Sequence, residues 1–223
     1  MEHMLTILII INIIINIAIF SIFELKKPAV RDFLPLVVIC AGASLGRVIF
    51  SFLPQIQPVT VLVIITGSAY GSLYGYVTGS LCALISNMML GQGPWTFFQM
   101  TGWGMIGFIA GIIGHLFKRM PEKNNNIISA DDFCKPRSCT IKEKGYGELA
   151  VFSMYGFLSA FLFSIITDTL SVAYLGEAVT LPSAIAVFAT GMVFNVGHGI
   201  FNVVLIILLY KPVKKSLLRC KCT

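Results

Sequence analysis

Residues 86–103, Ser86-Asn-Met-Met-Leu-Gly-Gln-Gly-Pro-Trp-Thr-Phe-Phe-Gln-Met-Thr-Gly-Trp103, interrupt a long apolar sequence and decide how the chain is organised. Gly91, Gly93 and Pro94 predict a turn, because glycine and proline both disfavour helix. Tryptophan prefers the level of the lipid headgroups, and amides supply donors and acceptors without charge. Two interpretations fit: a loop that holds a neutral or zwitterionic small molecule at a membrane face, or an interfacial turn with an aromatic belt. The side chains concerned are Asn87, Gln92, Trp95, Gln99 and Trp103.

The composition excludes a soluble domain. The 223 residues are 57% hydrophobic and 12% charged, whereas soluble proteins carry about 25% charged residues. Mean hydropathy is +0.87, and apolar runs reach the about 20 residues that cross a bilayer. The first run, Leu5 to Phe23, is too long for a signal-peptide core and lacks a small-residue cleavage site. We interpret it as a retained helix that ends at Glu24-Leu-Lys-Lys-Pro28.

The apolar runs predict an all-α integral membrane bundle. Seven helical spans are expected, at about residues 4–23, 33–53, 59–70, 72–90, 96–117, 148–173 and 183–209. The third is short, and only Gly67 and Gly71 divide residues 59–90, so a single long tilted helix there is the alternative. With one helix instead of two, every later segment would change sides of the membrane.

The basic residues favour seven spans. Of the 16 Lys and Arg residues, 15 fall within three segments, 26–31, 118–144 and 211–221, and short cytoplasmic loops retain such charge. Seven spans place all three segments on one side, with the N-terminus outside and the C-terminus in the cytoplasm. Six spans would separate the first segment from the other two. The connections at 54–58, 91–95 and 174–182, which lack Lys and Arg, are then expected to face outward.

Residues 118–147 are polar and without periodicity, so we expect a flexible cytoplasmic loop there. It divides the chain into an N-terminal helix at 1–27, a front part at 28–117 and a back part at 148–223, which holds two helices and a basic tail. The predicted topology keeps four thiols reduced in the cytoplasm, and their spacing matches no common zinc pattern. These are Cys134, Cys139, Cys220 and Cys222, whereas Cys40 and Cys82 are expected to pack inside spans.

Polar residues inside spans are costly and therefore candidates for function. Arg47 lies in the second span, where it is expected either to face an outer cavity or to form a structural ion pair with Asp168 of the sixth. Asn195, His198 and Asn202 share one helical face, which predicts a polar seam or a cavity wall. A zinc or cobalt site on this face is a weaker interpretation than a polar seam, because only one histidine lies there.

Small residues in the second span predict close helix contact, either internal or with a partner subunit. They are Ala41, Gly42, Ala43, Ser44 and Gly46. The sequence contains no GxxxxGK[ST], HExxH or GxSxG motif and no carboxylate pair placed for acid–base chemistry, so we expect no enzyme.

Several motifs together resemble the substrate-specific S components of energy-coupling factor (ECF) vitamin transporters. They are Gly46-Arg47, Leu53-Pro-Gln-Ile-Gln-Pro58, the glycines at 67, 71, 75 and 79, Ser86-Asn87, Gly91-Gln-Gly-Pro-Trp-Thr96 and Gln99-Met100. The similarity covers about residues 28–117. Because family members have six helices, the first span is an addition to that core.

The resemblance implies a bacterial plasma-membrane subunit that captures a micronutrient in an outward-facing cavity between residues 54–58 and 87–96. A membrane coupling subunit and two cytoplasmic ATPases, which alone use ATP, would drive uptake; the other partner is the bilayer, and no nucleic acid is expected. The coupling subunit would contact Ala41, Gly42, Ala43 and Gly46. The expected substrate-binding residues are Arg47, Gln55, Gln57, Asn87, Gln92, Trp95, Gln99, Trp103, Asn195 and His198.

No covalently bound cofactor is expected, and the ligand is expected to be the vitamin itself. The branch resembled is associated with cobalamin or related corrinoids, which would suit a lining of amides and tryptophan. Riboflavin, a queuosine precursor or another vitamin would suit it too. A non-transporting assembly factor or sensor with a purely structural polar seam is the competing class.

Overall fold

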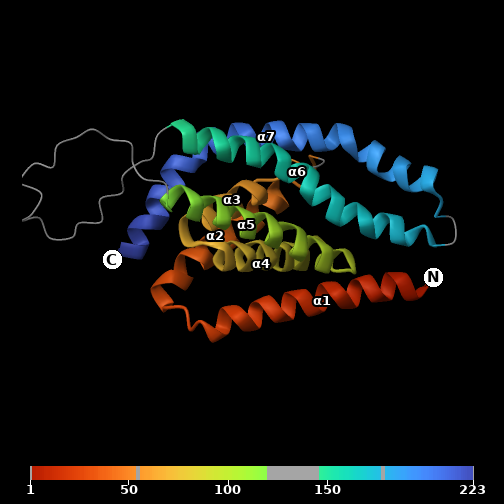
Figure 1. Cartoon of the computed structure of the whole chain (residues 1–223), viewed down its shortest axis with the longest axis horizontal. Helices are drawn as coiled ribbons and strands as arrows, with labels where there is room; N and C mark the ends of the chain where they lie inside the picture. The colour runs from red at the N-terminus through yellow and green to blue at the C-terminus, as the bar shows by residue number, and fades with distance from the viewer. Residues whose placement is uncertain (1, 54–55, 120–145, 177–178, 223) are drawn as a thin grey trace, which may run out of the picture.

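The structure is a computed structural model that describes residues 2–53, 56–119, 146–176 and 179–222. Over these residues the chain forms seven α-helices and no strand (Figure 1). Six helices are long and apolar enough to cross a membrane, and α3 is the shorter exception. An all-α membrane bundle is therefore confirmed. The helices are α1 (Glu2–Leu25), α2 (Val30–Ile49), α3 (Val59–Tyr70), α4 (Ser72–Leu90), α5 (Trp95–Arg119), α6 (Tyr146–Tyr174) and α7 (Leu181–Cys222).

Residues 59–90 form two helices that turn back on each other at Gly71. Gly71 has φ 108°, a backbone conformation that residues with a Cβ rarely adopt. Its N–H closes α3 on the carbonyl of Gly67, and its own carbonyl accepts the N–H of Gly75 in α4. The alternative of one long helix is therefore wrong. With 12 residues, α3 is about 18 Å long, less than the about 30 Å of a bilayer core.

Glycines let α3, α4 and α5 approach backbone to backbone. A Cβ on Gly75 would lie 2.3 Å from the carbonyl oxygen of Gly107, and one on Gly67 would lie 2.2 Å from the same atom. On Gly79 it would lie 2.4 Å from the carbonyl oxygen of Trp103. Close contact of this kind suits a lipid environment, where no hydrophobic effect drives helices together. It explains the glycine spacing seen in the sequence.

The ends of the helices sort by charge. The end of α1, the start of α2, the end of α5, the start of α6 and the end of α7 lie together at one end of the bundle, on the left of Figure 1. Lys26, Lys27, Lys211 and Lys215 belong to these ends. Over the described residues the basic segments thus gather as the charge pattern predicts. Which membrane face they meet stays a prediction.

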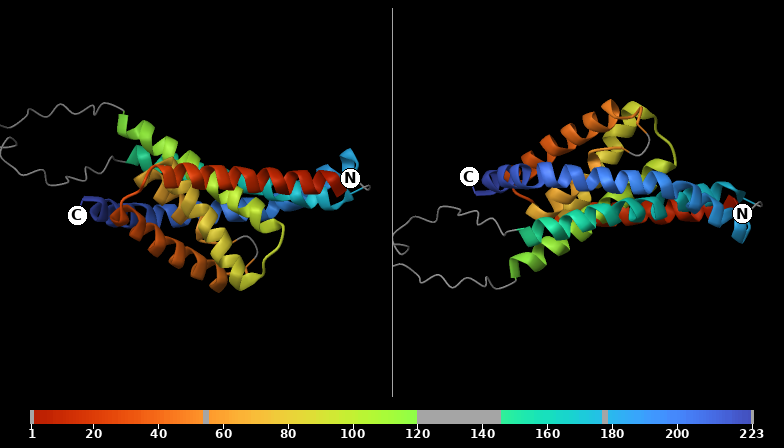
Figure 2. Two further views of the ribbon diagram at one scale, coloured as in Figure 1. Left: turned by 90° about the horizontal axis from the view of Figure 1, so that it is seen from below. Right: turned by 90° about the horizontal axis from the view of Figure 1, so that it is seen from above.

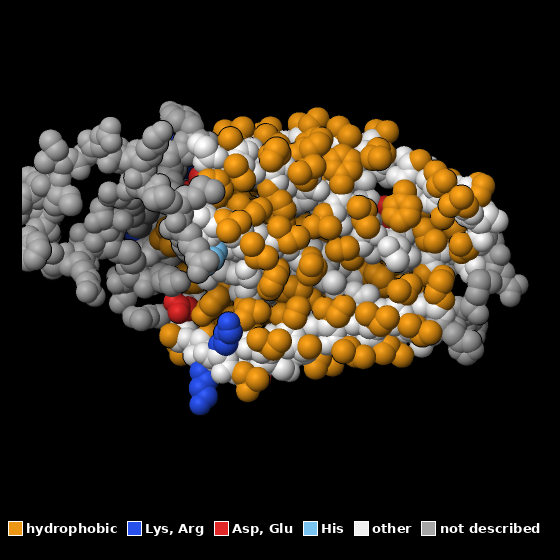
Figure 3. Space-filling model, in the orientation of Figure 1, with side chains coloured by type: hydrophobic (Ala, Val, Ile, Leu, Met, Phe, Trp, Pro, Cys, Tyr) orange, Lys and Arg blue, Asp and Glu red, His pale blue; other side chains and the backbone are white. Residues whose placement is uncertain are grey.

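Apolar side chains cover the outer surface between the ends (Figure 3). Ile7, Ile14 and Ile17 of α1 and Val193 of α7 are all exposed. Figure 2 shows α2 and α4 inclined to the direction shared by α1, α6 and α7. An exposed apolar belt on helices of this length fits a multi-pass membrane protein.

The N-terminal helix α1 contacts the bundle through Phe23, whose ring lies 5.2 Å from that of Tyr74 in α4, and through the hydrogen bonds of Asn16. Asn16 donates from Nδ2 to Thr101 Oγ1 of α5 at 3.0 Å. Its Oδ1 accepts from Tyr76 and Ser80 of α4, both at 3.3 Å. Asn16 is buried, and sequence reasoning did not single it out. The sequence signal available was a polar residue inside an isoleucine-rich span.

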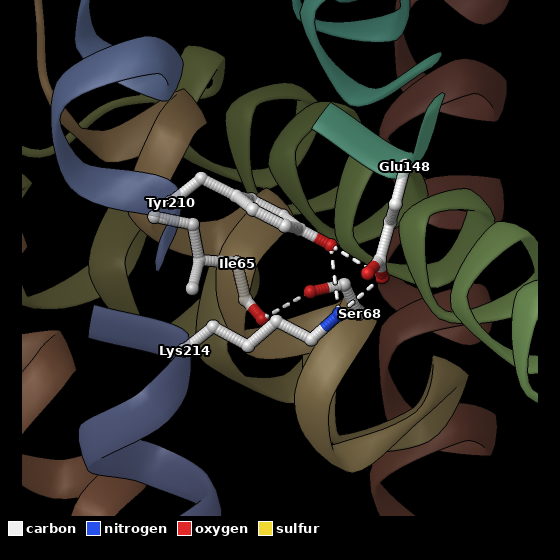
Figure 4. Close-up of polar contacts among 5 residues, drawn as sticks. All are labelled: Ile65, Ser68, Glu148, Tyr210 and Lys214. Carbon is white, nitrogen blue, oxygen red and sulfur yellow. Dashed lines mark hydrogen bonds and ion pairs between the residues drawn. The ribbon is translucent and has the colours of Figure 1, made fainter. Parts of the chain in front are cut away.

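Helix α7 continues to Cys222, well beyond its predicted end at residue 209. Polar contacts hold the continuation against the bundle (Figure 4). Lys214 forms an ion pair with Glu148 of α6, and Tyr210 Oη donates to the same carboxylate at 2.9 Å. Tyr70 Oη donates to the carbonyl of Leu217 at 2.9 Å. Residues 210–217 are therefore packed helix, although their charges suggested a tail.

Candidate functional site

Arg47 lies in the last turn of α2 with only 6% of its surface exposed. Its guanidinium donates to four side chains on three different segments. Nη1 reaches Ser86 Oγ and Asn87 Oδ1 of α4, both at 2.6 Å. Nε reaches Gln57 Oε1, just before α3, at 3.2 Å, and Nη2 reaches Gln99 Oε1 of α5 at 3.1 Å. Arg47 therefore joins α2, α4, α5 and the α2–α3 connection at one point, which we call the Arg47 network.

All acceptors of the guanidinium are neutral. The proposed ion pair with Asp168 is wrong, because that carboxylate instead accepts from Ser164 one turn earlier in α6. Among the described residues, no Asp or Glu makes an ion pair with Arg47. Depth along a helix is readable from sequence, but the direction in which a side chain points across the bundle is not. A buried cation without a countercharge results.

A second set of hydrogen bonds closes the turn between α4 and α5. Asn87 Nδ2 donates to Gln99 Oε1 at 2.8 Å and to Thr96 Oγ1 at 3.0 Å. Thr96 donates in turn to Gln92 Oε1 at 2.8 Å, and Gln92 Nε2 donates to the carbonyl of Leu84 at 3.1 Å. The side-chain carboxamides of Asn87, Gln92 and Gln99 thus close the turn, and those of Asn87 and Gln99 also bind Arg47. Thr96 was not predicted, and as a single threonine it gave no separate signal.

Trp103 carries the network to the last helix. Its ring lies 4.8 Å from the Arg47 guanidinium carbon and stacks on Phe163 at 4.5 Å. Its Nε1 donates to Thr60 Oγ1 at 3.1 Å, and that hydroxyl lies 3.2 Å from His198 Nε2 of α7. Thr60 Oγ1 thus links Trp103 of α5 to His198 of α7.

The predicted polar stripe of α7 divides among three neighbours. His198 joins Thr60, whereas Asn195 donates to Ser164 Oγ at 2.8 Å and Asn202 donates to the carbonyl of Gly156 at 3.0 Å. His198 Nδ1 and Asn202 Oδ1 are buried and make no hydrogen bond with the described residues. The stripe is therefore mainly a seam between α7 and its neighbours, and only His198 belongs to the Arg47 network.

Two predicted site residues lie apart from the guanidinium. Trp95 is 43% exposed, and its ring packs against Gly93 of its own turn. Gln92 is exposed and reaches the network only through Thr96. Gln55 lies outside the described residues. The structure thus brings together Arg47, Gln57, Asn87, Gln99, Trp103 and His198, and it leaves Trp95 and Asn195 outside.

The small residues of α2 divide between surface and interior. Ala41 and Gly42 are exposed, and a Cβ on Gly42 would meet no atom within 4 Å. Ala43 is fully buried, and a Cβ on Gly46 would lie 2.6 Å from Pro58 Cγ. Of the four residues expected to contact a coupling subunit, only Ala41 and Gly42 are exposed enough to do so.

Cys40 and Cys82 are buried between α2 and α4, as predicted for packing residues, and both are reduced. In the part of the chain that the structure describes, no three His, Cys, Asp or Glu side chains are grouped as metal ligands. Cys134 and Cys139 lie outside the described residues.

A cavity of about 300 Å³ lies at the basic end of the bundle, away from the Arg47 network. Phe23, Lys26, Tyr70 and Tyr74 line it, and none of them belongs to the Arg47 network.

Comparison with known proteins gives no relative: no family model, no curated protein and no solved structure matches the chain.

Proposed function

We propose that this chain is the membrane-embedded substrate-binding subunit of an ECF-type importer. It would capture a vitamin or related micronutrient at the outer face of the bacterial plasma membrane. A membrane coupling subunit and two ATPases would then drive uptake, with ATP used only by the ATPases. The bundle itself would bind the micronutrient and carry out no reaction.

The convergence on Arg47 is the observation that supports this proposal. Residues from the α2–α3 connection, the end of α4 and the start of α5 meet around one buried cation. These are the segments to which the family resemblance assigns the ligand cavity. Buried polar groups gathered at one end of an apolar bundle are typical of small-molecule sites.

Cobalamin or a related corrinoid is the ligand we favour, because the motifs resemble the branch associated with corrinoids. The carboxamides of Gln57, Asn87 and Gln99 and the ring of Trp103 suit a ligand that carries many amide groups. Riboflavin or a queuosine precursor would use the same kinds of contact.

A non-transporting membrane protein, such as an assembly factor or sensor, is the second candidate. One observation favours it: the Arg47 side chain already donates to four neighbours within the chain. A polar cluster satisfied in this way can serve stability alone.

Uptake separates the two candidates. Cells that lack other corrinoid importers would express the chain with an ECF coupling module, and uptake of radiolabelled cyanocobalamin, riboflavin and queuine would be measured. We expect ATP-dependent accumulation of one of them, lost in an Asn87→Ala variant that still reaches the membrane. No accumulation of any vitamin, with the chain assembled on the module, would favour the non-transporting class.

A further inference from the structure

The guanidinium of Arg47 has two edges that differ in their contacts. On Nη1, the bonds to Ser86 and Asn87 are short, both 2.6 Å, and buried. On Nε and Nη2, the bonds to Gln57 and Gln99 are longer, 3.2 and 3.1 Å, and only partly buried. The Nη1 side is thus held by α4, while the other edge meets Gln57 of the α2–α3 connection and Gln99 of α5.

The Nε and Nη2 edge is the one that arginine uses to bind a carboxylate or phosphate side-on. Its two N–H groups point the same way and match two oxygens of a single anion. Here two separate carboxamide oxygens, from Gln57 and Gln99, stand at these N–H groups. These two neutral oxygens occupy the N–H groups that an anion would use.

We propose that the ligand of this site carries a carboxylate or phosphate group that docks on Nε and Nη2 of Arg47 and displaces the oxygens of Gln57 and Gln99. This inference rests on the proposed function and names the chemistry of the ligand at the same site. A bound anion would give the buried cation the countercharge that the described residues do not provide. The desolvation of Arg47 has already occurred in the folded chain, so only the anion of the ligand remains to be desolvated when the pair forms.

The two glutamines are suited to exchange. Gln57 lies outside any helix and is half-buried. Gln99 Oε1 also accepts from Asn87 Nδ2 at 2.8 Å, so it keeps a donor when Arg47 leaves it. Trp103 lies 4.8 Å from the guanidinium carbon, with its ring beneath the cation, and holds the plane in position.

The candidate ligands differ in whether they carry an anionic group. Cobalamin carries a phosphodiester, cobinamide lacks that group, and riboflavin is neutral where its 5′-phosphate is charged. The proposal therefore favours a complete cobalamin over cobinamide, and it disfavours riboflavin itself.

The test uses the full chain purified in detergent and its melting temperature. The variant Gln57→Glu places a fixed carboxylate at Nε with no change of size. Gln92→Glu is the control, because it adds the same charge on the neighbouring turn without contacting Arg47. We expect Gln57→Glu to melt higher by about 2–4 °C and the control to show no rise.

Matched probes then test the anion. They are benzoate against benzamide, riboflavin 5′-phosphate against riboflavin, and cyanocobalamin against dicyanocobinamide. The charged member of at least one pair should raise the melting temperature of the parent and bind, by calorimetry, about tenfold or more tighter than its neutral partner. The same probe should lose that effect on Gln57→Glu, whose own carboxylate occupies the edge.

Three outcomes would overturn the inference. The first is a Gln57→Glu variant that melts at or below the parent. The second is that in all three pairs the neutral probe binds as tightly as the partner that carries the anionic group; if uptake is still observed, the proposed function stands and only the anion is refuted. The third is no effect of any charged probe on the parent. If the parent chain binds the anionic probe but supports no uptake of any vitamin, the proposed function is refuted and the anion site stands.

Discussion

At the scale of single residues, Asn87 holds the Arg47 network together. Its Oδ1 accepts from Arg47, and its Nδ2 donates both to Gln99 and to Thr96. It is almost fully buried. Both the oxygen and the nitrogen of the Asn87 carboxamide are therefore used within the chain. Removing this side chain leaves Arg47 without one acceptor and Gln99 without one donor.

Asn87→Ala is expected to lower the free energy of unfolding by about 1–3 kcal/mol, the cost of leaving buried polar groups unpaired. Gln92→Ala, on the same turn but exposed, should stay within about 0.5 kcal/mol. Chemical unfolding in detergent micelles would measure both. Equal effects would mean that the turn, and not its buried centre, carries the stability.

The sequence predicted most members of this network but not their pairing. Arg47, Gln57, Asn87, Gln99 and Trp103 were all candidates, because polar or aromatic residues stand out in apolar spans. Asp168 was the wrong partner, since two residues at similar depth can point to different sides of a bundle. Trp95 and Trp103 were both candidates, but only Trp103 is buried beside Arg47, because an interfacial tryptophan and a buried one have the same sequence signal.

At the scale of helices, polar side chains decide how the two outermost elements attach. The surface of α1 is mostly apolar and exposed, and Asn16 supplies its bonds to α4 and α5. Asn12, one turn earlier, donates only to the carbonyl of Leu8 in its own helix. The two asparagines are thus a matched pair for measuring attachment.

Asn16→Leu is expected to destabilise the packing of α1 by about 0.6–2 kcal/mol, the range measured for hydrogen bonds between membrane helices. Asn12→Leu should cost less, because no contact to another helix is lost. Disulfide trapping between cysteines introduced on α1 and α5 would report the docked fraction. Equal loss in both variants would show that apolar packing alone attaches α1.

The end of α7 is held by charge. Lys214 has 14% of its side chain exposed and Glu148 has 11%, and Lys214 also lies 4.9 Å from the Tyr210 ring centroid. We expect Glu148→Gln and Lys214→Met each to destabilise the protein, and the double variant to lose less than the sum by about 1–3 kcal/mol. A double-mutant cycle of unfolding free energies would measure this coupling. Additive losses would mean that the two residues act independently.

Glycines act at the same scale, and here the sequence was informative. Gly67 and Gly71 were read as the division between two helices, which the structure confirms, but the close backbone contacts of Gly67, Gly75 and Gly79 with α5 were not predicted. The end of α7 was not predictable in this way. A basic stretch predicts solvent exposure, and the sequence does not show that Glu148, a carboxylate from a distant segment, pairs with Lys214.

The exposed face of α2 is where the whole molecule would meet a coupling subunit. Gly42→Leu adds a side chain where no atom lies within 4 Å, so the isolated protein should keep its stability within about 0.5 kcal/mol. If a partner helix packs there, co-purification with the coupling subunit should fall several-fold, because bulk separates closely packed helices. Gly46→Leu is not a suitable variant, since it would meet Pro58 inside the chain. Unchanged co-purification with Gly42→Leu would place the partner on another face.

The orientation of the whole bundle in the membrane follows from its charge. Lys211, Lys215 and Arg219 lie with the basic ends of α1 and α2, and the positive-inside rule predicts that this end faces the cytoplasm. Cys220 is exposed at this end, while Cys40 and Cys82 are buried. In intact cells, a membrane-impermeant maleimide should therefore leave the natural chain unlabelled. A Gln92→Cys variant, with its new thiol exposed on the α4–α5 turn, should be labelled, and Cys220 should react only after the cells are opened. Labelling of Cys220 in intact cells, with Gln92→Cys protected, would invert the bundle and place the Arg47 network at the cytoplasmic face, where it could not capture a nutrient from outside.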